Sequence, residues 1–150
     1  MIDYQAIWNE VTSSFRCEPD SIHGPEHWHR VEDVGMKIAH LTGRVDRDVV
    51  RLFAVLHDSC RLSDTSDPEH GERAAEYAKG MRGRLFDISD DQFGQLYKAC
   101  RLHNRGFISH DPTIGACFDA DRMDLRRVGI EPDPSFISTP EVRRTLKPRS

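Results

Sequence analysis

The stretch DRDVVRLFAVLHD (residues 46–58) carries the strongest indication of the fold. Its apolar residues recur at the spacing of an α-helix, and Asp46 is of a residue type that caps helix N-termini. A run this apolar belongs in the protein interior, so the His57–Asp58 pair at its end is expected to be buried. A buried charge needs a partner, and a divalent cation suits both an imidazole and a carboxylate. The stretch therefore predicts a core helix that ends at a metal ion.

Helical patterns continue on both sides of this stretch, whereas no alternating Val/Ile/Thr run is long enough for a strand. Proline and capping residues predict where several helices begin: Pro25, Asp67-Pro68, Ser89 and Asp111-Pro112. We expect helices over residues 2–16, 25–43, 46–58, 67–81, 89–103 and 111–126, with a short last one from Thr139 and a frayed tail over 146–150. The predicted fold class is all-α, with about six to seven helices.

Composition bounds the function. The chain has 150 residues and a formal charge of −4, which favours one domain and gives no basic tract for a long nucleic acid. No apolar stretch is long enough for a membrane span, and the polar N-terminus does not read as a signal peptide. The four cysteines lack CxxC spacing and are interpreted as free thiols in a reducing compartment, which predicts a cytoplasmic protein.

A second group of candidate ligands lies in IHGPEHWHRV (residues 22–31). If the helix begins at Pro25, His27 falls in its first turn and faces inward with Val31. His23 and His29 are expected to be solvated or capping histidines.

The third group is CFDADRMDL (residues 117–125), which has three carboxylates in an otherwise apolar helix. Asp121 shares a face with Cys117 and Leu125, and Asp124 lies one turn further along the same side. Carboxylates on a core-facing stripe call for a cation. The alternative is that all three are surface charges paired with Arg122 or Arg126.

Together the three motifs, in this order and at these distances, resemble the HD-domain superfamily of metal-dependent phosphohydrolases. The likeness runs from about residue 21 to residue 130, so we expect a single HD domain over 1–150 with its core in 21–130. The resemblance implies a helical bundle around a metal site, and its motifs map the ligands onto His27, His57, Asp58 and Asp121. The ion is expected to be Mn, Fe, Co, Ni, Zn or Mg.

Some HD branches hold a second metal with two further histidines, which here correspond to His70 and His103, with Asp58 bridging the ions. The alternative is that both histidines lie beside a single metal, where they support its ligands or contact the substrate. The G-Y-P segment of the cyclic-dinucleotide branch is missing after His103, where Gly106-Phe107-Ile108 stands instead. This difference disfavours a cyclic dinucleotide as substrate.

The predicted function is hydrolysis of a small phosphate ester by metal-activated water, and a nucleotide is the expected substrate. The residues expected to catalyse it are Asp58, His70, His103 and Asp124, and those expected to bind substrate are Arg61, Asn104 and Arg122. For both arginines the plain alternative is a surface salt bridge. The loops 59–67 and 104–111 are expected to line the substrate pocket. The residues in them that could determine substrate specificity are Asp64, Ser66, Asn104 and Arg105.

Two rival functions remain open at the level of sequence. One is an HD-type di-iron oxygenase, which requires both His70 and His103 as ligands. The other is a non-catalytic sensing module that retains its metal for folding. The N-terminal helix and residues 130–142 are expected either to cover the core or to mediate a homodimer.

Overall fold

The computed structural model describes residues 1–146 and confirms the all-α prediction. Within that range the chain forms seven α-helices and two 3₁₀ helices, and its only extended pairing consists of isolated bridges at Phe86. The α-helices are α1 (Tyr4–Ser14), α2 (Pro25–Thr42), α3 (Arg47–Leu56), α4 (His70–Met81), α5 (Asp90–Leu102), α6 (Pro112–Met123) and α7 (Pro140–Arg143). None of the helices in residues 1–146 is both long and apolar enough to cross a membrane.

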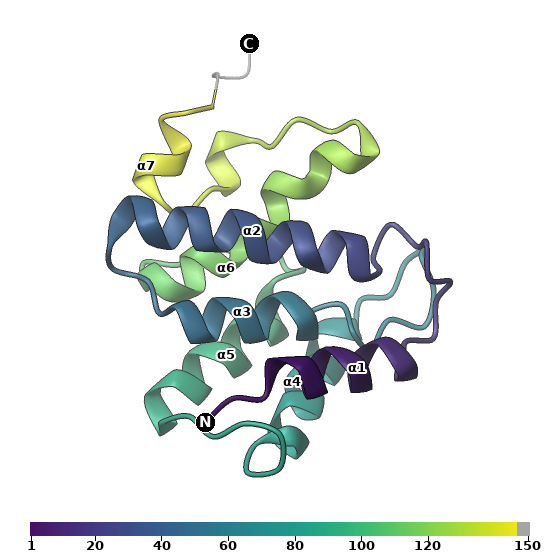
Figure 1. The fold of residues 1–150 in the computed structure, drawn as a ribbon. Coiled ribbons are helices and arrows are strands. Elements are labelled where there is room, and N and C mark those ends of the chain that lie inside the picture. The colour runs from purple at the N-terminus through teal and green to yellow at the C-terminus, as the bar shows by residue number, and fades with distance from the viewer. Residues whose placement is uncertain (147–150) are drawn as a thin grey trace.

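Helix α3 is the centre of the bundle. Every residue from Leu52 to Leu56 is fully buried, and the helix packs against α1, α2, α5 and α6. Asp46 caps it as predicted, because its side chain accepts a hydrogen bond from the Val49 amide at 3.1 Å. Figure 1 shows α2 and α3 lying side by side, with α4 and α5 on the opposite side of α3 from α2.

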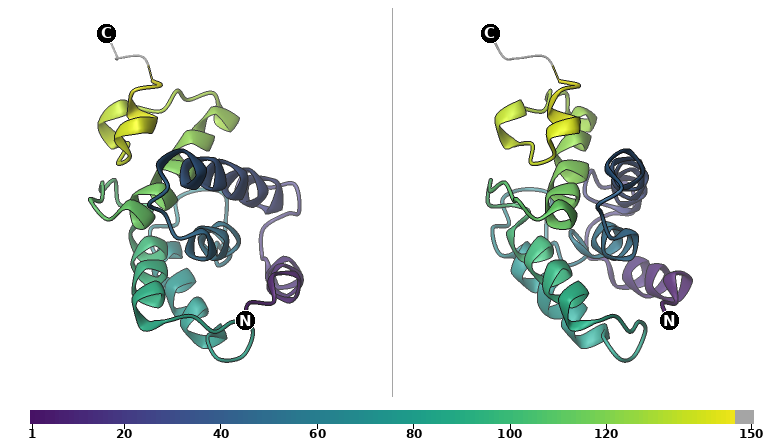
Figure 2. Two further views of the ribbon diagram at one scale, coloured as in Figure 1. Left: turned by 60° about the vertical axis from the view of Figure 1, so that its left-hand side comes forward. Right: turned by 90° about the vertical axis from the view of Figure 1, so that its left-hand side faces the viewer.

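Two close helix approaches shape the bundle around α3. A Cβ at Gly35 of α2 would lie 2.4 Å from Val50 Cγ1, so glycine is required for α2 to sit this near α3. A Cβ at Gly71 of α4 would lie 2.7 Å from the carbonyl oxygen of Cys100 on α5. These contacts hold α2 close to α3 and α4 close to α5, and each of these four helices carries a buried histidine at one of its ends. The helix packing is visible in Figure 2.

The segment after α6 closes one end of the bundle. It forms the 3₁₀ helices Asp124–Val128 and Pro134–Phe136 and then α7, and it buries Ile137 and Val142 in the core. The core thus includes residues on both sides of the predicted 21–130 interval, since Ile7 and Val11 of α1 are also fully buried. Parts of α1 and of residues 130–142 therefore pack into the core, and the homodimer stays a prediction.

Several predicted helix bounds were wrong. Helix α4 begins at His70, because the Asp67 carboxylate accepts hydrogen bonds from Arg73 and from the Leu62 amide and does not cap a helix. Helix α6 ends at Met123, where the chain tightens into a 3₁₀ turn. Leu146 packs against the core and is not frayed, and the rest of the predicted frayed tail, 147–150, lies outside the described residues.

Candidate metal centre

Four buried histidines, His27, His57, His70 and His103, lie in two pairs whose Nε2 atoms face each other. His57 follows the last turn of α3, and its Nδ1 lies 3.1 Å from the carbonyl oxygen of Phe53. His103 follows α5 in the same way, with Nδ1 2.7 Å from the carbonyl oxygen of Cys100. Carbonyl oxygens only accept, so each Nδ1 carries the proton and donates it, which leaves Nε2 with a lone pair.

The other two histidines are held in the same manner. His70 donates from Nδ1 to the carbonyl oxygen of Asp67 at 2.5 Å, and His27 donates from Nδ1 to the Asp124 carboxylate at 2.6 Å. A histidine that ligates a metal commonly donates its other ring nitrogen to a carboxylate or a carbonyl in this way.

The first set of ligand atoms comes from α2, from the two residues after α3, and from α6. His27 Nε2 lies 3.0 Å from His57 Nε2 and 3.1 Å from Asp121 Oδ1. The Asp58 Oδ2 atom lies 3.3 Å from His27 Nε2 and 3.5 Å from His57 Nε2. These are the four residues predicted as metal ligands, and the fold brings them together although 94 positions separate the first from the last along the chain, residue 27 to residue 121.

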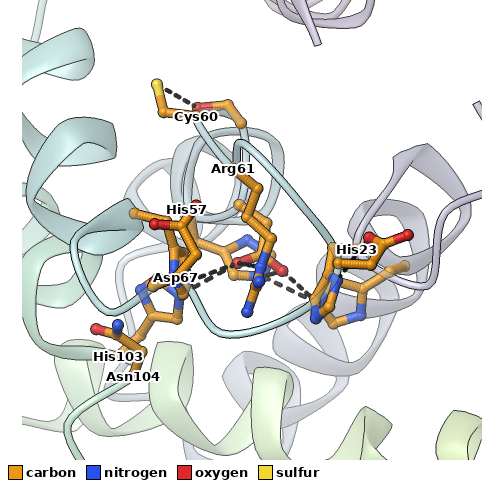
Figure 3. Close-up of polar contacts among 12 residues, drawn as sticks. His23, His57, Cys60, Arg61, Asp67, His103 and Asn104 are labelled. Atoms are coloured by element: carbon orange, nitrogen blue, oxygen red, sulfur yellow. Dashed lines mark hydrogen bonds and ion pairs between the residues drawn. The ribbon is translucent and has the colours of Figure 1, made fainter. Parts of the chain in front are cut away.

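A second set lies beside the first and shares Asp58. Asp58 Oδ1 is 3.1 Å from His70 Nε2 and 3.3 Å from His103 Nε2, and these two nitrogens are 3.0 Å apart. Because its two oxygens face different sets, the Asp58 carboxylate is placed to bridge two ions. Figure 3 shows this part of the site, with His57 and His103 on the same side of Arg61.

This geometry fits divalent metal ions. Ligands about 2.1 Å from an ion lie roughly 3.0–3.4 Å apart in octahedral or tetrahedral arrangements, and the separations in both sets are close to this range. Two Nε2 lone pairs facing each other at 3.0 Å repel unless a proton or a cation lies between them. The residues could therefore hold one metal in each set.

The electrostatics of the site agree with this reading. Burial alone would lower the pKa of His27, but the carboxylates of Asp121, Asp124 and Asp58 outweigh it and raise that pKa to about 10. Burial alone would raise the pKa of Asp121, but the His57 and His27 imidazoles hold it well below its ordinary value. Asp58 behaves likewise: the histidines around it outweigh burial and keep its pKa well below the usual range. Without an ion, the proton that His27 retains is the positive charge next to these carboxylates.

Asp124 lies behind His27, on the ring edge opposite the shared ligand atoms. It is buried, and Arg30 Nε donates to its Oδ1 at 2.9 Å. The predicted part of Asp124 in proton transfer is untested, but its position is that of a residue orienting His27 and increasing its basicity.

A cavity of about 270 Å³ opens beside the second set of ligands. The three residues predicted to bind substrate all line it, namely Arg61, Asn104 and Arg122. Arg122 is buried: its guanidinium lies over the Phe118 ring and donates to the Phe136 carbonyl oxygen at 2.8 Å, with Nη2 left without a partner. Arg61 donates to the carbonyl oxygens of Ser63 and Thr65, and its Nε lies 3.9 Å from Asp58 Oδ1. Neither arginine is a surface salt bridge, so that alternative is wrong.

The sequence reasoning misplaced His23. It is buried, it lines the same cavity, and its Nδ1 lies 3.0 Å from Asp64 Oδ1, so it is neither solvated nor a helix cap. His29, by contrast, is exposed and stacks on Trp8 with ring centroids 4.2 Å apart. The sequence offered no local signal for this placement, because His23 precedes α2 and its partner is Asp64, 41 positions away.

One other carboxylate, Asp119, and one arginine, Arg105, lie away from the candidate site. Asp119 is fully buried but accepts hydrogen bonds from the Ser138 and Thr139 amides at 2.7 and 2.8 Å, so its partner is backbone and not a cation. The alternative of three surface carboxylates is wrong, since Asp119 and Asp124 are buried and Asp121 is largely so. Arg105 is exposed and pairs with Glu72.

No family model and no curated protein matches the sequence, and no solved structure matches the fold. The assignment of function therefore rests on the geometry and chemistry of this site.

Proposed function

We propose that the protein is a metal-dependent phosphohydrolase that acts on a small phosphate ester such as a nucleotide. Two metal ions would be held, one by His27, His57, Asp58 and Asp121, the other by Asp58, His70 and His103. When bound, divalent metals lower the pKa of water and polarise a phosphoryl oxygen.

The protein's own residues supply the remaining requirements. The four histidines are locked by their Nδ1 hydrogen bonds, so the ligand atoms need no reorganisation when an ion enters. Arg61 and Arg122 line the cavity beside the ligands, where guanidinium groups offset the charge of a phosphate. The small volume of the cavity, about 270 Å³, favours a small substrate over a polymer.

The observation that carries this proposal is the shared Asp58. Its two oxygens face two separate sets of imidazole nitrogens at 3.1–3.5 Å. Packing of the helices alone does not require this arrangement of polar atoms. Paired divalent metals a few ångströms apart clamp both the attacking and the leaving oxygen in phosphate-ester hydrolysis.

The test is a panel of phosphate esters assayed with Mn²⁺, Ni²⁺, Co²⁺ or Mg²⁺ after stripping with a chelator. We expect turnover that depends on added metal and that His57→Ala abolishes, while His40→Ala, an exposed histidine on α2, retains it. Absence of turnover by the wild type with every ester and metal would reject the proposal in favour of a metal-retaining sensing module.

A di-iron oxygenase is the second candidate, and one observation favours it. A di-iron oxygenase of this kind requires both His70 and His103 as ligands. Their Nε2 atoms both lie within 3.3 Å of Asp58 Oδ1. Iron content, colour and oxygen consumption of the protein purified without added metal separate it from a hydrolase.

A further inference from the structure

One cavity histidine lies outside both ligand sets. His23 lines the cavity together with His70 and His103, but it belongs to neither group of atoms that could hold an ion. In Figure 3 Arg61 lies between His23 on one side and His103 and Asn104 on the other.

Its ring is held in a defined orientation. Nδ1 donates to the Asp64 carboxylate at 3.0 Å, which leaves Nε2 as the nitrogen free to face a ligand. The backbone of His23 is anchored on both sides, because its amide donates to Ser21 Oγ at 3.0 Å and its carbonyl accepts from Trp28 Nε1 at 2.7 Å. Ser21 Oγ also donates to Asp64, so one carboxylate orients both the ring and the turn that carries it.

We propose that His23 is the general acid of the hydrolysis, delivering a proton from Nε2 to the oxygen of the leaving alcohol, and that Asp64 is its positioning residue. This inference rests on the proposed function. It assigns a role to the cavity histidine that the metal sites do not use.

The step balances without a further reactant. A water oxygen forms a bond to phosphorus while the bond from phosphorus to the ester oxygen breaks, and the bonding electron pair stays on the leaving oxygen. That oxygen takes the proton from Nε2 and departs as a neutral alcohol. The proton released by the attacking water restores the imidazolium before the next turnover.

The charges around His23 suit a group that gains its proton as substrate binds. Asp64 and Asp58 favour the imidazolium, whereas Arg61, Arg127 and burial disfavour it, and in the free protein burial dominates and lowers the pKa of His23. A phosphate dianion beside Arg61 would offset the arginine charge and add its own attraction for the imidazolium. The proton would thus be held most firmly when the ester is in place.

The test compares two esters that differ in their need for an acid. A p-nitrophenyl leaving group departs readily as an anion, whereas the alkoxide of an alkyl phosphate such as glycerol phosphate requires protonation. For His23→Gln we expect kcat on the alkyl ester to fall about 10²–10⁴-fold and on p-nitrophenyl phosphate by less than about tenfold. Asp64→Asn should act in the same direction with a smaller loss, and both variants should lose the alkaline limb of the kcat–pH profile for the alkyl ester.

Two controls make the result decisive. His40→Gln, on an exposed histidine of α2, should leave both activities unchanged. Metal stoichiometry and affinity for Mn²⁺, measured by calorimetric titration, should be the same in His23→Gln as in the wild type. Asp64 is half-exposed, so Asp64→Asn keeps the test available if His23→Gln fails to fold.

The unfavourable outcomes are distinct. Equal losses on the two esters would overturn the acid role, and loss of a metal ion from His23→Gln would make His23 a ligand instead. If the wild type hydrolyses neither ester with any metal, the proposed function fails and this inference falls with it. If the wild type is active and His23→Gln matches it on the alkyl ester, only this inference fails.

Discussion

At the scale of single residues, the hydrogen bond between Asp124 and His27 is the contact most open to test. It joins the end of α6 to the first turn of α2, and Arg30 pairs with the same carboxylate. A carboxylate that accepts a hydrogen bond from the other ring nitrogen of a ligating imidazole orients the ring and strengthens it as an electron-pair donor to the metal.

We therefore predict that Asp124→Asn lowers the affinity for Mn²⁺ by about 10–100-fold, because the amide keeps the shape but loses the charge. Calorimetric titration of the stripped protein measures this change. Asp33→Asn, an exposed carboxylate on the same helix as His27, is the matched control and should bind as the wild type does. Unchanged affinity in Asp124→Asn would refute a role in orienting His27.

The proton on His27 leads to a second prediction. The carboxylates around it raise its pKa to about 10, so in the metal-free protein it is charged at neutral pH. Its contribution to stability is complete below the ordinary histidine pKa of about 6.5 and is lost as the pH rises through the folded value. Because a metal requires the neutral ring, binding at neutral pH must displace this proton.

Metal affinity should accordingly rise as the pH is raised from about 7 toward 10, with release of a proton on binding. Titrations in buffers with different ionisation enthalpies count the protons released. An affinity independent of pH across this interval would contradict the charge state assigned to His27.

At the scale of helices, the contact between α4 and α5 determines whether His70 and His103 meet. Gly71 adjoins His70, and a Cβ there would lie 2.7 Å from the Cys100 carbonyl oxygen and 2.9 Å from Asn104 Oδ1. Backbone cannot yield as a flexible side chain can, so an added methyl group has to push the two helices apart.

We expect Gly71→Ala to destabilise the fold by about 1–3 kcal/mol and to weaken the second metal site more than the first. Gly80→Ala is the control on the same helix: nothing lies within 4 Å of its Cβ, and the change should stabilise by roughly 0.5–1 kcal/mol. Denaturant unfolding and metal stoichiometry report the two effects. Two full sites in Gly71→Ala would show that the helices can separate without parting the histidines.

At the scale of the whole molecule, the ligands tie α2, α3, α4, α5 and α6 into one unit. An ion bound to residues from several helices stabilises only the folded chain, since the unfolded chain does not bring these residues together.

Free metal at 100 times its dissociation constant should add about 2.7 kcal/mol to the free energy of unfolding. For a chain of this size that corresponds to a rise in Tm of roughly 5–10 °C. Thermal unfolding with Mn²⁺ and then with excess chelator tests this, and His57→Ala, which removes a ligand of the first set only, should reduce the shift while His40→Ala keeps it. The same Tm in both conditions would show that the site is empty in solution.

The helices and the first set of candidate ligands were predictable, because their signals lie in adjacent residues or in charged residue types within apolar stretches. Asp46 and the apolar run after it specify α3 through capping and periodicity, properties of adjacent residues. A His–Asp pair at the end of a buried helix needs a polar or charged partner, and a divalent cation can serve both residues. Asp121 could be matched to it because a carboxylate on an apolar helix face has the same need.

Other features depended on contacts between segments far apart along the chain. Whether Asp67 caps α4 or pairs with Arg73 is a competition between two nearby partners, and the loop geometry favours the ion pair. Asp119 resembles Asp121 in the sequence, yet it faces the backbone near α7, because a displacement of two residues turns a side chain about 200° around a helix. His23 became a cavity residue because residue 64 folds back onto it from 41 positions away. Residue types and periodicity are local properties, whereas the partner of each polar side chain depends on how the helices pack.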